Sequence, residues 1–248
     1  MHCARRLAIA LAAFIALGSG STAGAEDVSD PLEPINRGIF WFNDKADVYV
    51  LEPTARGWNY VLPDRVQTAI GNFFENVRFP VVMINNLLQA KVVEASSDVG
   101  RFLINTTIGI AGFFDPATGF GLERNDEDFG QTLGYWGVPP GPYLVAPLLG
   151  PLNLRDGTGR LVDTATAVYP LFAAAPYTIG ATAVNTVNFR SQVLSEVRNA
   201  KAASLDYYVF VRDAYDQSRK ARVEDRVDID EERVEDLYFG DFEDEQSE

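Results

Sequence analysis

Apolar side chains recur at helical spacing in several segments of this chain, and that spacing predicts helices. The clearest segment is residues 64–77, which Pro63-Asp64 opens and whose apolar side chains fall on one helical face. These side chains are Val66, Ile70, Phe73, Phe74 and Val77. A second helix is expected over residues 80–93, because Pro80 suits a first helical position. The polar side chains beside its apolar stripe are expected to face solvent or, in a ring, a wet lumen. They are Asn85, Asn86 and Gln89.

The same spacing predicts three further helices. Residues 36–50 are expected to form a short helix with an aromatic face, and such aromatics are most often core anchors. Residues 96–114 are apolar nearly all round from Phe102 onward, a pattern typical of a helix that is deeply buried or touches lipid. The apolar part of about 13 residues spans only ~20 Å and is too short to cross a bilayer. Residues 190–223 are expected to form one long helix.

Residues 129–154 carry no Asp, Glu, Lys or Arg, and their many glycines and prolines rule out a single helix. Ordinary loops are polar because their backbone groups reach water. An apolar, broken backbone indicates either a loop buried in the core, which the pattern alone favours, or a cavity wall at membrane depth. No alternation is regular enough to predict a strand.

The charges in the middle of the chain fall in two clusters, residues 115–128 and 155–163. Residues 164–189 are again free of charge and too interrupted to span a membrane. Apolar, broken segments between charged clusters fit helices that lie in a membrane interface better than helices that cross the bilayer. A large soluble helical core would show this clustering less often. The acids at 126–128 lack the spacing of a calcium loop and are expected to be solvated.

Residues 1–25 are expected to be a secretory signal peptide. They contain a basic start at Arg5-Arg6, an apolar segment at 7–17 and a small-residue cleavage site at 23–25. The apolar segment is too short for a membrane span, and the cleavage site disfavours the alternative of an uncleaved anchor. Cleavage would leave a mature chain that begins at Glu26.

Such a mature chain would contain no histidine and no cysteine, because His2 and Cys3 lie in the signal segment. This excludes disulfides, His or Cys nucleophiles, haem ligation through these residues and the usual zinc sites. The sequence also has no nucleotide-binding loop, no nucleophile elbow and no serine–lysine pair at SxxK spacing. We therefore predict that the protein is not an enzyme and has no catalytic residues, no metal site and no cofactor.

The net charge of the chain is −14, and removal of the signal segment would make it more negative. This charge disfavours nucleic acid as a partner, and it requires that any membrane contact be hydrophobic. A basic protein partner would be attracted. Residues 224–248 form an acidic tail whose only cations are Arg226 and Arg233, and such tails are typically disordered and solvating.

Several motifs over about residues 28–220 occur in the order found in a known family. They are Asp30-Pro31-Leu32-Glu33, Asn36-Arg37, Phe42-Asn43, FLINTTIG at 102–109, Gly112-Phe113-Phe114-Asp115, EDFGQTLG at 127–134, Gly141-Pro142-Tyr143 and Leu154-Arg155-Asp156, then Asp206, Tyr208, Arg212 and Tyr215. In these motifs the chain resembles the MlaA (VacJ) family.

The resemblance implies an all-α fold, a ring of amphipathic helices lying in the membrane interface around a central channel, with irregular Gly/Pro-rich segments. The helical domain would cover residues 26–223. It implies a role in phospholipid transport that maintains outer-membrane lipid asymmetry, in which mislocalised phospholipids leave the outer leaflet through the channel. The implied partners are phospholipid, an outer-membrane porin trimer and a periplasmic MlaC-like lipid carrier. The implied location is the periplasmic leaflet of the outer membrane.

The resemblance also implies candidate site residues. A mobile hairpin beside the channel would correspond to residues 135–142, with Gly137 as its hinge. The candidates for the channel and hairpin are Tyr135, Trp136, Gly137, Pro139, Gly141, Tyr143 and Leu144. The candidates for a helix at the channel mouth are Phe40, Trp41, Phe42 and Asn43.

One departure from the family concerns the lipid anchor. Members are typically lipoproteins whose signal ends in a lipobox cysteine, whereas Cys3 here precedes the apolar segment and is followed by Arg5-Arg6. Retention at the membrane would then rest on the apolar segments and on porin binding. The alternative function is a soluble periplasmic helical adaptor without a lipid passage, and the missing histidine disfavours a lipid hydrolase.

Overall fold

The computed structural model describes residues 28, 30–167 and 175–225. The expected signal segment and nearly all of the acidic tail therefore lie outside the described residues. The helical elements, in order, are α2 (Glu33–Ala46), the π-helical turn η1 (Asp47–Leu51), α3 (Glu52–Val61), α4 (Asp64–Leu88), α5 (Val92–Thr107), α6 (Pro116–Gly119), α7 (Phe129–Tyr135), α8 (Leu154–Thr166), α10 (Ala175–Gln192), α11 (Leu194–Ala203) and α12 (Tyr207–Val223). The strands are β1 (Tyr143–Ala146) and β2 (Gly150–Asn153).

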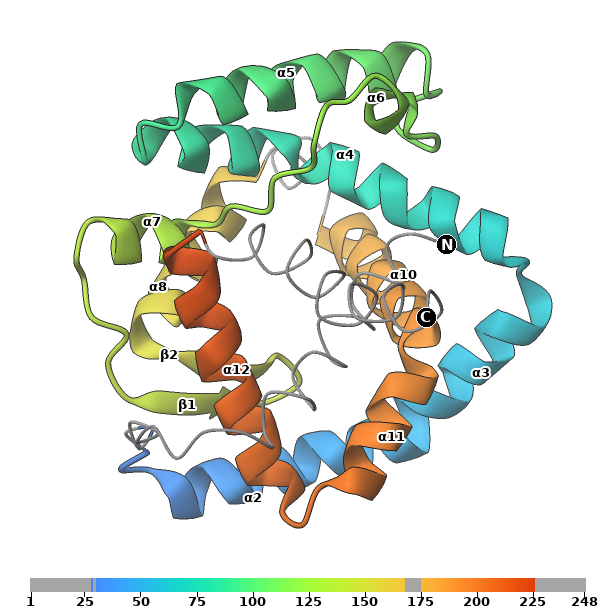
Figure 1. The fold of residues 1–248 in the computed structure, drawn as a ribbon. Coiled ribbons are helices and arrows are strands. Elements are labelled where there is room, and N and C mark those ends of the chain that lie inside the picture. Colours follow the sequence, from blue (N-terminus) through green and yellow to red (C-terminus); the bar gives the residue numbers. More distant parts are fainter. Residues whose placement is uncertain (1–27, 29, 168–174, 226–248) are drawn as a thin grey trace, which may run out of the picture.

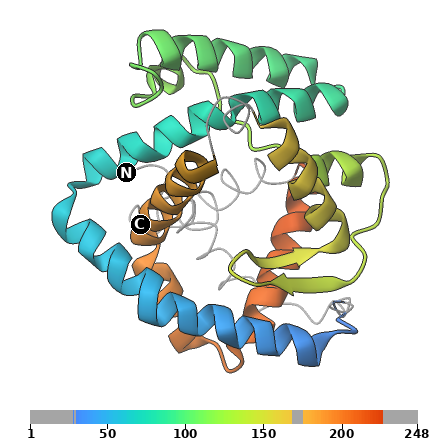
Figure 2. The same ribbon diagram turned by 180° about the vertical axis from the view of Figure 1, so that it is seen from behind.

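These elements follow one another around a ring, which both faces of the molecule show (Figures 1 and 2). Helices α2, η1 and α3 form one arc, α4 forms the next, and α7, α8, the strands and α12 complete the opposite side. Helix α10 packs against both α3 and α4, and α2 packs against β1, so the ring is held by contacts between distant segments. Helices α5 and α6 lie outside the ring, with α5 against α4. The prediction of an all-α ring is confirmed.

Within the described ranges, no helix combines the length and hydrophobicity that crossing a membrane requires.

Helix α4 runs without interruption through Pro80, so the prediction that a second helix begins there is wrong. A proline inside a helix removes one backbone hydrogen bond and costs about 3 kcal/mol. The helix survives because its flanks pack against α5. The ring of Phe79 stacks on that of Phe102 at 4.5 Å, and Val81 and Val82 are buried directly after the proline.

The helix expected over residues 96–114 begins earlier, at Val92, and ends at Thr107. The chain leaves the helix because Ile110, Ala111 and Gly112 have positive φ angles of 54°, 57° and 90°. A Cβ at Gly112 would collide with the side chain of Asn76 on α4, so only glycine fits this close approach. An apolar composition alone did not reveal this turn.

The single long helix expected over residues 190–223 is also wrong, because the segment forms the end of α10 and all of α11 and α12. Asp206 starts α12 as its N-cap. Its Oδ1 accepts hydrogen bonds from the backbone N–H groups of Tyr208, at 3.0 Å, and Val209, at 3.2 Å. The apolar spacing continues across these breaks, which explains why periodicity suggested one helix.

Residues 129–154 do not form one helix, as predicted, but they contain a short antiparallel hairpin that the sequence did not predict. Strand β1 pairs with β2 in a register that sets Tyr143 opposite Asn153. Two asparagines of α2, seven residues apart, complete the free edge of β1. Asn36 donates to the carbonyl of Tyr143 and accepts from the N–H of Val145, both at 3.0 Å. Asn43 donates to the carbonyl of Ala146 at 2.9 Å and accepts from the backbone N–H of Leu148, in the turn between the strands, at 2.8 Å.

Polar side chains, rather than apolar ones, fill most of the interior. Among the described residues, the largest fully buried side chains are those of Gln131, Asn36, Asn85, Asn86, Asn188 and Thr132. The one cluster of buried apolar side chains in this part of the chain is small and centres on Tyr143, Val145 and Tyr208. Large apolar side chains are instead exposed around the ring, among them Trp41, Tyr60, Leu103, Ile108, Leu148 and Tyr177. This distribution is the reverse of that in a water-soluble protein.

The buried asparagines correct a second expectation, that they face solvent or a lumen. Asn85 donates to Asp163 at 3.1 Å and accepts from the hydroxyl of Thr132 at 2.9 Å. Asn86 donates to Asp98 at 2.7 Å. These bonds join α4 to α5, α7 and α8, because a buried amide requires partners.

Candidate functional site

Helices α4, α8 and α10 enclose a cavity of about 460 Å³, here called the apolar chamber. Its wall from α4 is formed by Phe73, Phe74, Val77 and Val81, the same apolar stripe that predicted the helix. The opposite walls contribute Ala167, Tyr177 and Ala181, and polar groups come from all three helices. The polar groups are Arg78, Asp163, Thr164, Thr178, Thr182 and Asn185. A mostly apolar cavity with few polar groups is the usual form of a site for a small amphipathic ligand.

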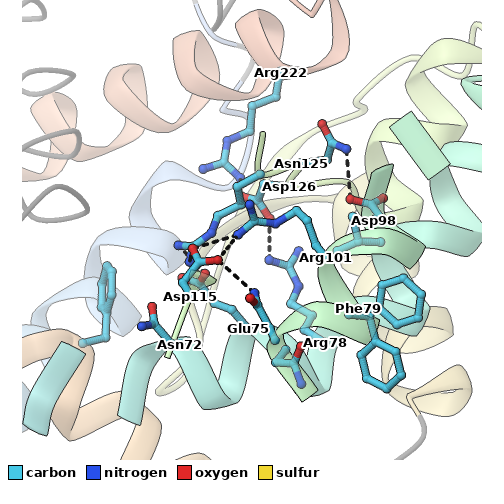
Figure 3. Close-up of a pocket in the computed structure, with 16 residues that line it drawn as sticks. Asn72, Glu75, Arg78, Phe79, Asp98, Arg101, Asp115, Asn125, Asp126 and Arg222 are labelled. Atoms are coloured by element: carbon cyan, nitrogen blue, oxygen red, sulfur yellow. Dashed lines mark hydrogen bonds and ion pairs between the residues drawn. The ribbon is translucent and has the colours of Figure 1, made fainter. Parts of the chain in front are cut away.

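A second cavity of about 330 Å³, here called the polar chamber, lies on the other side of α4 (Figure 3). Its α4 wall is formed by Asn72, Glu75, Asn76, Phe79 and Val82, and these residues also recur at helical spacing. The remaining lining residues include charges of both signs from α5, α12 and the segment between α5 and α7. They are Asp98, Arg101, Asp115, Arg124, Asp126 and Arg222.

Ion pairs bind the segment between α5 and α7 to the wall of the polar chamber. Arg101 of α5 donates from Nη2 to both carboxylate oxygens of Asp115, at 2.9 and 2.8 Å. Asn105 donates to the same carboxylate at 2.9 Å. Burial by itself raises the pKa of Asp115, but these donors and that of Thr118 outweigh it, so the pKa is lowered. Arg124 pairs with Glu75 of α4, which fixes the far end of the segment.

Arg78 is the one described residue that lines both chambers. Helical spacing explains this position, because residue 78 falls between the face that carries Phe73 and Val77 and the face that carries Glu75 and Phe79. Its guanidinium Nη1 donates to Asp126, whose other oxygen accepts from Arg222 at 2.7 Å. Burial lowers the pKa of Arg78, but the neighbouring carboxylates, Asp126 first, outweigh burial and raise it.

Asp163 brings a carboxylate from α8 to the apolar chamber. It accepts hydrogen bonds from the backbone N–H of Phe129 at 3.0 Å and from Asn85 at 3.1 Å. Burial raises the pKa of Asp163, and these two hydrogen bonds offset the effect only partly. Within the described part of the chain, Asp163 forms no ion pair.

The acids at 126–128, expected to be solvated, are held by partners. Glu127 is buried, accepts from Gln89 at 2.7 Å and pairs with Lys91 at 2.9 Å. Asp128 caps α7 by accepting from the N–H of Gln131 at 2.9 Å. The expectation of solvated acids is therefore wrong for the buried Glu127, whereas Asp128 is half-buried and Asp126 is exposed although it forms ion pairs. Among residues 28, 30–167 and 175–225, no three His, Cys, Asp or Glu side chains are grouped as a metal site.

Comparison with known proteins assigns the chain to a family. The family model described as MlaA lipoprotein matches residues 28–222. The chain belongs to the MlaA family.

Relatives and one solved structure support this membership. The Escherichia coli (strain K12) protein named Intermembrane phospholipid transport system lipoprotein MlaA is 34% identical over 220 residues, which cover 86% of each chain. The protein of the same name from Haemophilus influenzae is 34% identical over 84% of each chain. An uncharacterized protein of Rickettsia conorii is 38% identical over 84% of this chain and 83% of its own.

The solved structure was reported as "Structural basis for maintenance of bacterial outer membrane lipid asymmetry". It matches with a TM-score of 0.72 and 33% identity, and the match covers 79% of this chain and 99% of the other. The ring seen here is therefore the MlaA fold.

The hairpin residues predicted from the MlaA resemblance divide into two groups. Tyr135 is the exposed last residue of α7, and Trp136, Gly137, Pro139 and Gly141 lie on the exposed loop that follows it. Trp136 is anchored there, because its Nε1 donates to the carbonyl of Leu88 at 3.1 Å.

The other two hairpin candidates lie in β1. Tyr143 is buried in the small apolar cluster, where its ring contacts those of Tyr208 and Tyr215. Leu144 is half-buried opposite Leu152. The hairpin in this structure is therefore firmly attached to α2 and α12 at its strands, while its preceding loop is exposed.

The candidates for the channel-mouth helix also differ from one another. Phe40 packs against Tyr207 and Tyr208 at 5.5 and 5.4 Å between ring centroids, as a core anchor does. Trp41 and Phe42 are 62% and 49% exposed, so the core-anchor interpretation is wrong for them. Asn43 binds the hairpin, which brings the two predicted groups side by side.

None of the predicted site residues lines either chamber described above. The residues that sequence reasoning missed as a site are Arg78, Asp163 and the apolar side chains around them. The apolar stripe of α4 was visible in the sequence, but no residue near Arg78 in the sequence indicated that its side chain lines the same cavity as that stripe. The position of Asp163 opposite α4 depends on the fold alone.

Proposed function

We propose that this chain is a non-enzymatic component of phospholipid transport that maintains the lipid asymmetry of the outer membrane. It takes mislocalised phospholipids from the outer leaflet through the centre of the ring and passes them to a periplasmic carrier. The proposal is supported by the names of its relatives, which are called intermembrane phospholipid transport system lipoproteins. It is supported also by the similar solved structure, whose report concerns the maintenance of bacterial outer-membrane lipid asymmetry.

The observation that carries the proposal is the reversed distribution of polar and apolar side chains. The largest fully buried side chains of the described residues are amides and a threonine, while Trp41, Leu103 and Ile108 are more than half exposed. In water, so much exposed apolar surface would be costly, but in hydrocarbon it is the stable arrangement. A ring of this kind is suited to lie in one leaflet of a bilayer, with its helices in the plane of the membrane.

The two chambers provide what an amphipathic cargo requires. The apolar chamber offers Phe73, Phe74 and Val77 to acyl chains, and the polar chamber offers charged groups to a headgroup. Because α4 separates the chambers by only the width of one helix, both ends of a phospholipid can be accommodated nearby. Transport of this kind requires no bond to be broken and therefore no catalytic residues.

The partners and the location belong to the same proposal. We place the protein in the periplasmic leaflet of the outer membrane, in contact with a porin trimer and with a soluble MlaC-like carrier. The exposed apolar side chains provide the surface that lipid and porin would cover, so that the protein stays at the membrane whether or not it carries a lipid anchor.

Extraction of membranes tests this function against a soluble periplasmic adaptor. Membranes from cells that express the full chain are washed with carbonate, and the protein is then purified in detergent and its lipid content measured by mass spectrometry. We expect the protein to stay in the pellet and to carry phospholipid. Release of the protein by carbonate, with no phospholipid bound after purification, would contradict the proposal and favour the adaptor.

A further inference from the structure

Arg78 of α4 and Asp163 of α8 both line the apolar chamber, and Arg78 lines the polar chamber as well. We propose that these two side chains recognise the headgroup of the transported phospholipid, the guanidinium of Arg78 binding its phosphate and the carboxylate of Asp163 binding its ammonium group. The site then selects a zwitterionic ethanolamine headgroup. This inference rests on the proposed function and deepens it.

The guanidinium of Arg78 has donors left for a phosphate. The side chain is 45% exposed and lines both chambers, and only Nη1 is engaged, by Asp126. Within the described part of the chain, Nε and Nη2 have no protein acceptor. An arginine presents its donors as a planar fork that fits two phosphate oxygens, and such bidentate bonds are among the strongest in proteins. Arg78 therefore offers a phosphate-binding group at the edge of an apolar cavity.

Asp163 lacks the cation that a half-buried carboxylate needs. Its hydrogen bonds come from a backbone N–H and from the amide of Asn85, both uncharged donors. Burial raises the pKa of Asp163, because its two hydrogen bonds compensate the negative charge of the carboxylate only in part. Arg78 lies near enough to lower that pKa, but forms no ion pair with it. A primary ammonium would supply the missing charge and three N–H donors.

The charges around Arg78 discriminate against an anionic headgroup. Besides Asp126, the carboxylates of Asp128 and Asp163 act on Arg78. Asp126 also pairs with Arg222 and Asp128 with Arg219, so Asp163 is the one of these three acids that has no arginine of its own. A headgroup that brings a phosphate without an ammonium would leave Asp163 uncompensated and would add a like charge nearby. A choline headgroup carries the positive charge but has no N–H to donate to the carboxylate. Ethanolamine satisfies both residues.

Lipid binding by matched variants tests the assignment. The purified protein is equilibrated with mixed vesicles that contain equal amounts of phosphatidylethanolamine, phosphatidylglycerol and phosphatidylcholine, and the bound lipid is quantified by mass spectrometry. We expect the wild type to enrich phosphatidylethanolamine about tenfold, the effect of one good charged hydrogen bond. Arg78→Gln should lower all bound phospholipid about tenfold. Asp163→Asn should keep the phosphate contact but lose the preference for ethanolamine.

The variants are chosen so that the fold is preserved. Arg78→Gln leaves Asp126 paired with Arg222, so no buried carboxylate is abandoned. Arg78→Lys keeps the charge without the fork and should give an intermediate loss, which provides a second measurement if the glutamine variant folds poorly. Arg160→Gln removes an exposed arginine from α8, the helix of Asp163, and should bind lipid as the wild type does.

Three outcomes would overturn the inference, and each is distinct from failure of the proposed function. Equal amounts and equal headgroup composition in the wild type and both Arg78 variants would exclude Arg78 as a headgroup ligand, while transport could still occur. Thermal stabilisation by inorganic phosphate that Arg78→Gln abolishes, without any headgroup preference, would assign the site to a free phosphate ion. A preference for phosphatidylglycerol would exclude the role of Asp163. A wild type that binds no phospholipid at all would instead refute the proposed function.

Discussion

Gly137 adopts a φ of +85° in the exposed loop between α7 and β1. This left-handed backbone conformation is open to glycine and costly for other residues, because a Cβ crowds the neighbouring backbone. A Cβ built at this position meets no other atom within 4 Å, so any effect of a side chain here comes from the backbone. Gly57 of α3 has equally open surroundings but lies inside a helix. The two glycines therefore separate conformational strain from packing.

We expect Gly137→Ala to lower the free energy of unfolding by about 1 kcal/mol, because alanine must adopt the left-handed conformation. Gly57→Ala should raise it by about 0.5–1 kcal/mol, since alanine is the better helix former. Denaturant unfolding of both variants in the same detergent measures the difference. A stabilising effect of Gly137→Ala would show that the loop does not hold this conformation in solution.

Helices α7, α8 and α12 are joined by one arginine. Arg219 of α12 donates to both oxygens of Asp128, which caps α7, at 2.6 and 2.9 Å. Its Nε donates to Asp156 of α8 at 2.8 Å, and the hydroxyl of Tyr215 donates to the same carboxylate at 2.7 Å. Burial raises the pKa of both carboxylates, but Arg219 outweighs burial and holds both pKa values below their usual range. Three elements that are distant in sequence thus share one network.

Replacement of Arg219 by glutamine should destabilise the protein by about 3 kcal/mol, because it leaves the half-buried carboxylate of Asp128 without a cation and leaves the buried Asp156 with Arg155 alone. It should also change the pH dependence. A carboxylate whose pKa is lowered by folding stabilises the protein above its unfolded pKa of about 4, and this contribution is lost as the pH falls below that value. The wild type should therefore lose stability steeply in acid, and Arg219→Gln less steeply.

Thermal unfolding between pH 6 and pH 3 tests this prediction. Lys220→Gln is the matched control, because Lys220 is adjacent in sequence, is half exposed and pairs with Asp216 within one helical turn. It should change the stability by less than about 0.5 kcal/mol. Equal acid sensitivity in the wild type and in Arg219→Gln would mean that other carboxylates govern the acid transition.

At the scale of the whole molecule, the ring has a polar interior and an apolar exterior. Leu103 and Ile108, at the end of α5, are 56% and 64% exposed, and the turn after them exposes further apolar side chains. Neither side chain belongs to the buried polar network of α5, in which Asp98 accepts from Asn86 of α4 while Arg101 and Asn105 bind Asp115. The exterior can therefore be changed without disturbing the interior.

We expect Leu103→Glu to lower the fraction of protein bound to uncharged vesicles several-fold, because a carboxylate in hydrocarbon is strongly unfavourable. Helical content should be unchanged. Ser96→Glu, at an exposed position on the same helix, adds the same charge and should leave binding nearly unaffected. Vesicle flotation with circular dichroism gives both measurements. Equal flotation of the two variants would contradict membrane contact at this end of α5.

Apolar spacing predicted individual helices, the resemblance to the MlaA family implied the all-α ring, and the glycines and prolines of 129–154 correctly excluded a single helix. The break expected at Pro80 and the unbroken helix expected over 190–223 were wrong for one reason: packing between distant segments decides whether a local signal is obeyed. Of the predicted site residues, Phe40 and Asn43 are brought to the hairpin, while the chambers are formed by residues that the sequence did not single out.

The sequence by itself determined which segments are apolar, which are too interrupted to span a membrane, and which family the motifs resemble, because these properties are local. Only the tertiary structure decided that asparagines and arginines face inward and that apolar side chains face outward. Helical periodicity identifies two faces but does not say which one is buried. The tertiary structure also placed Arg78 and Asp163 in one cavity, since residues 85 positions apart are brought together only when the ring closes.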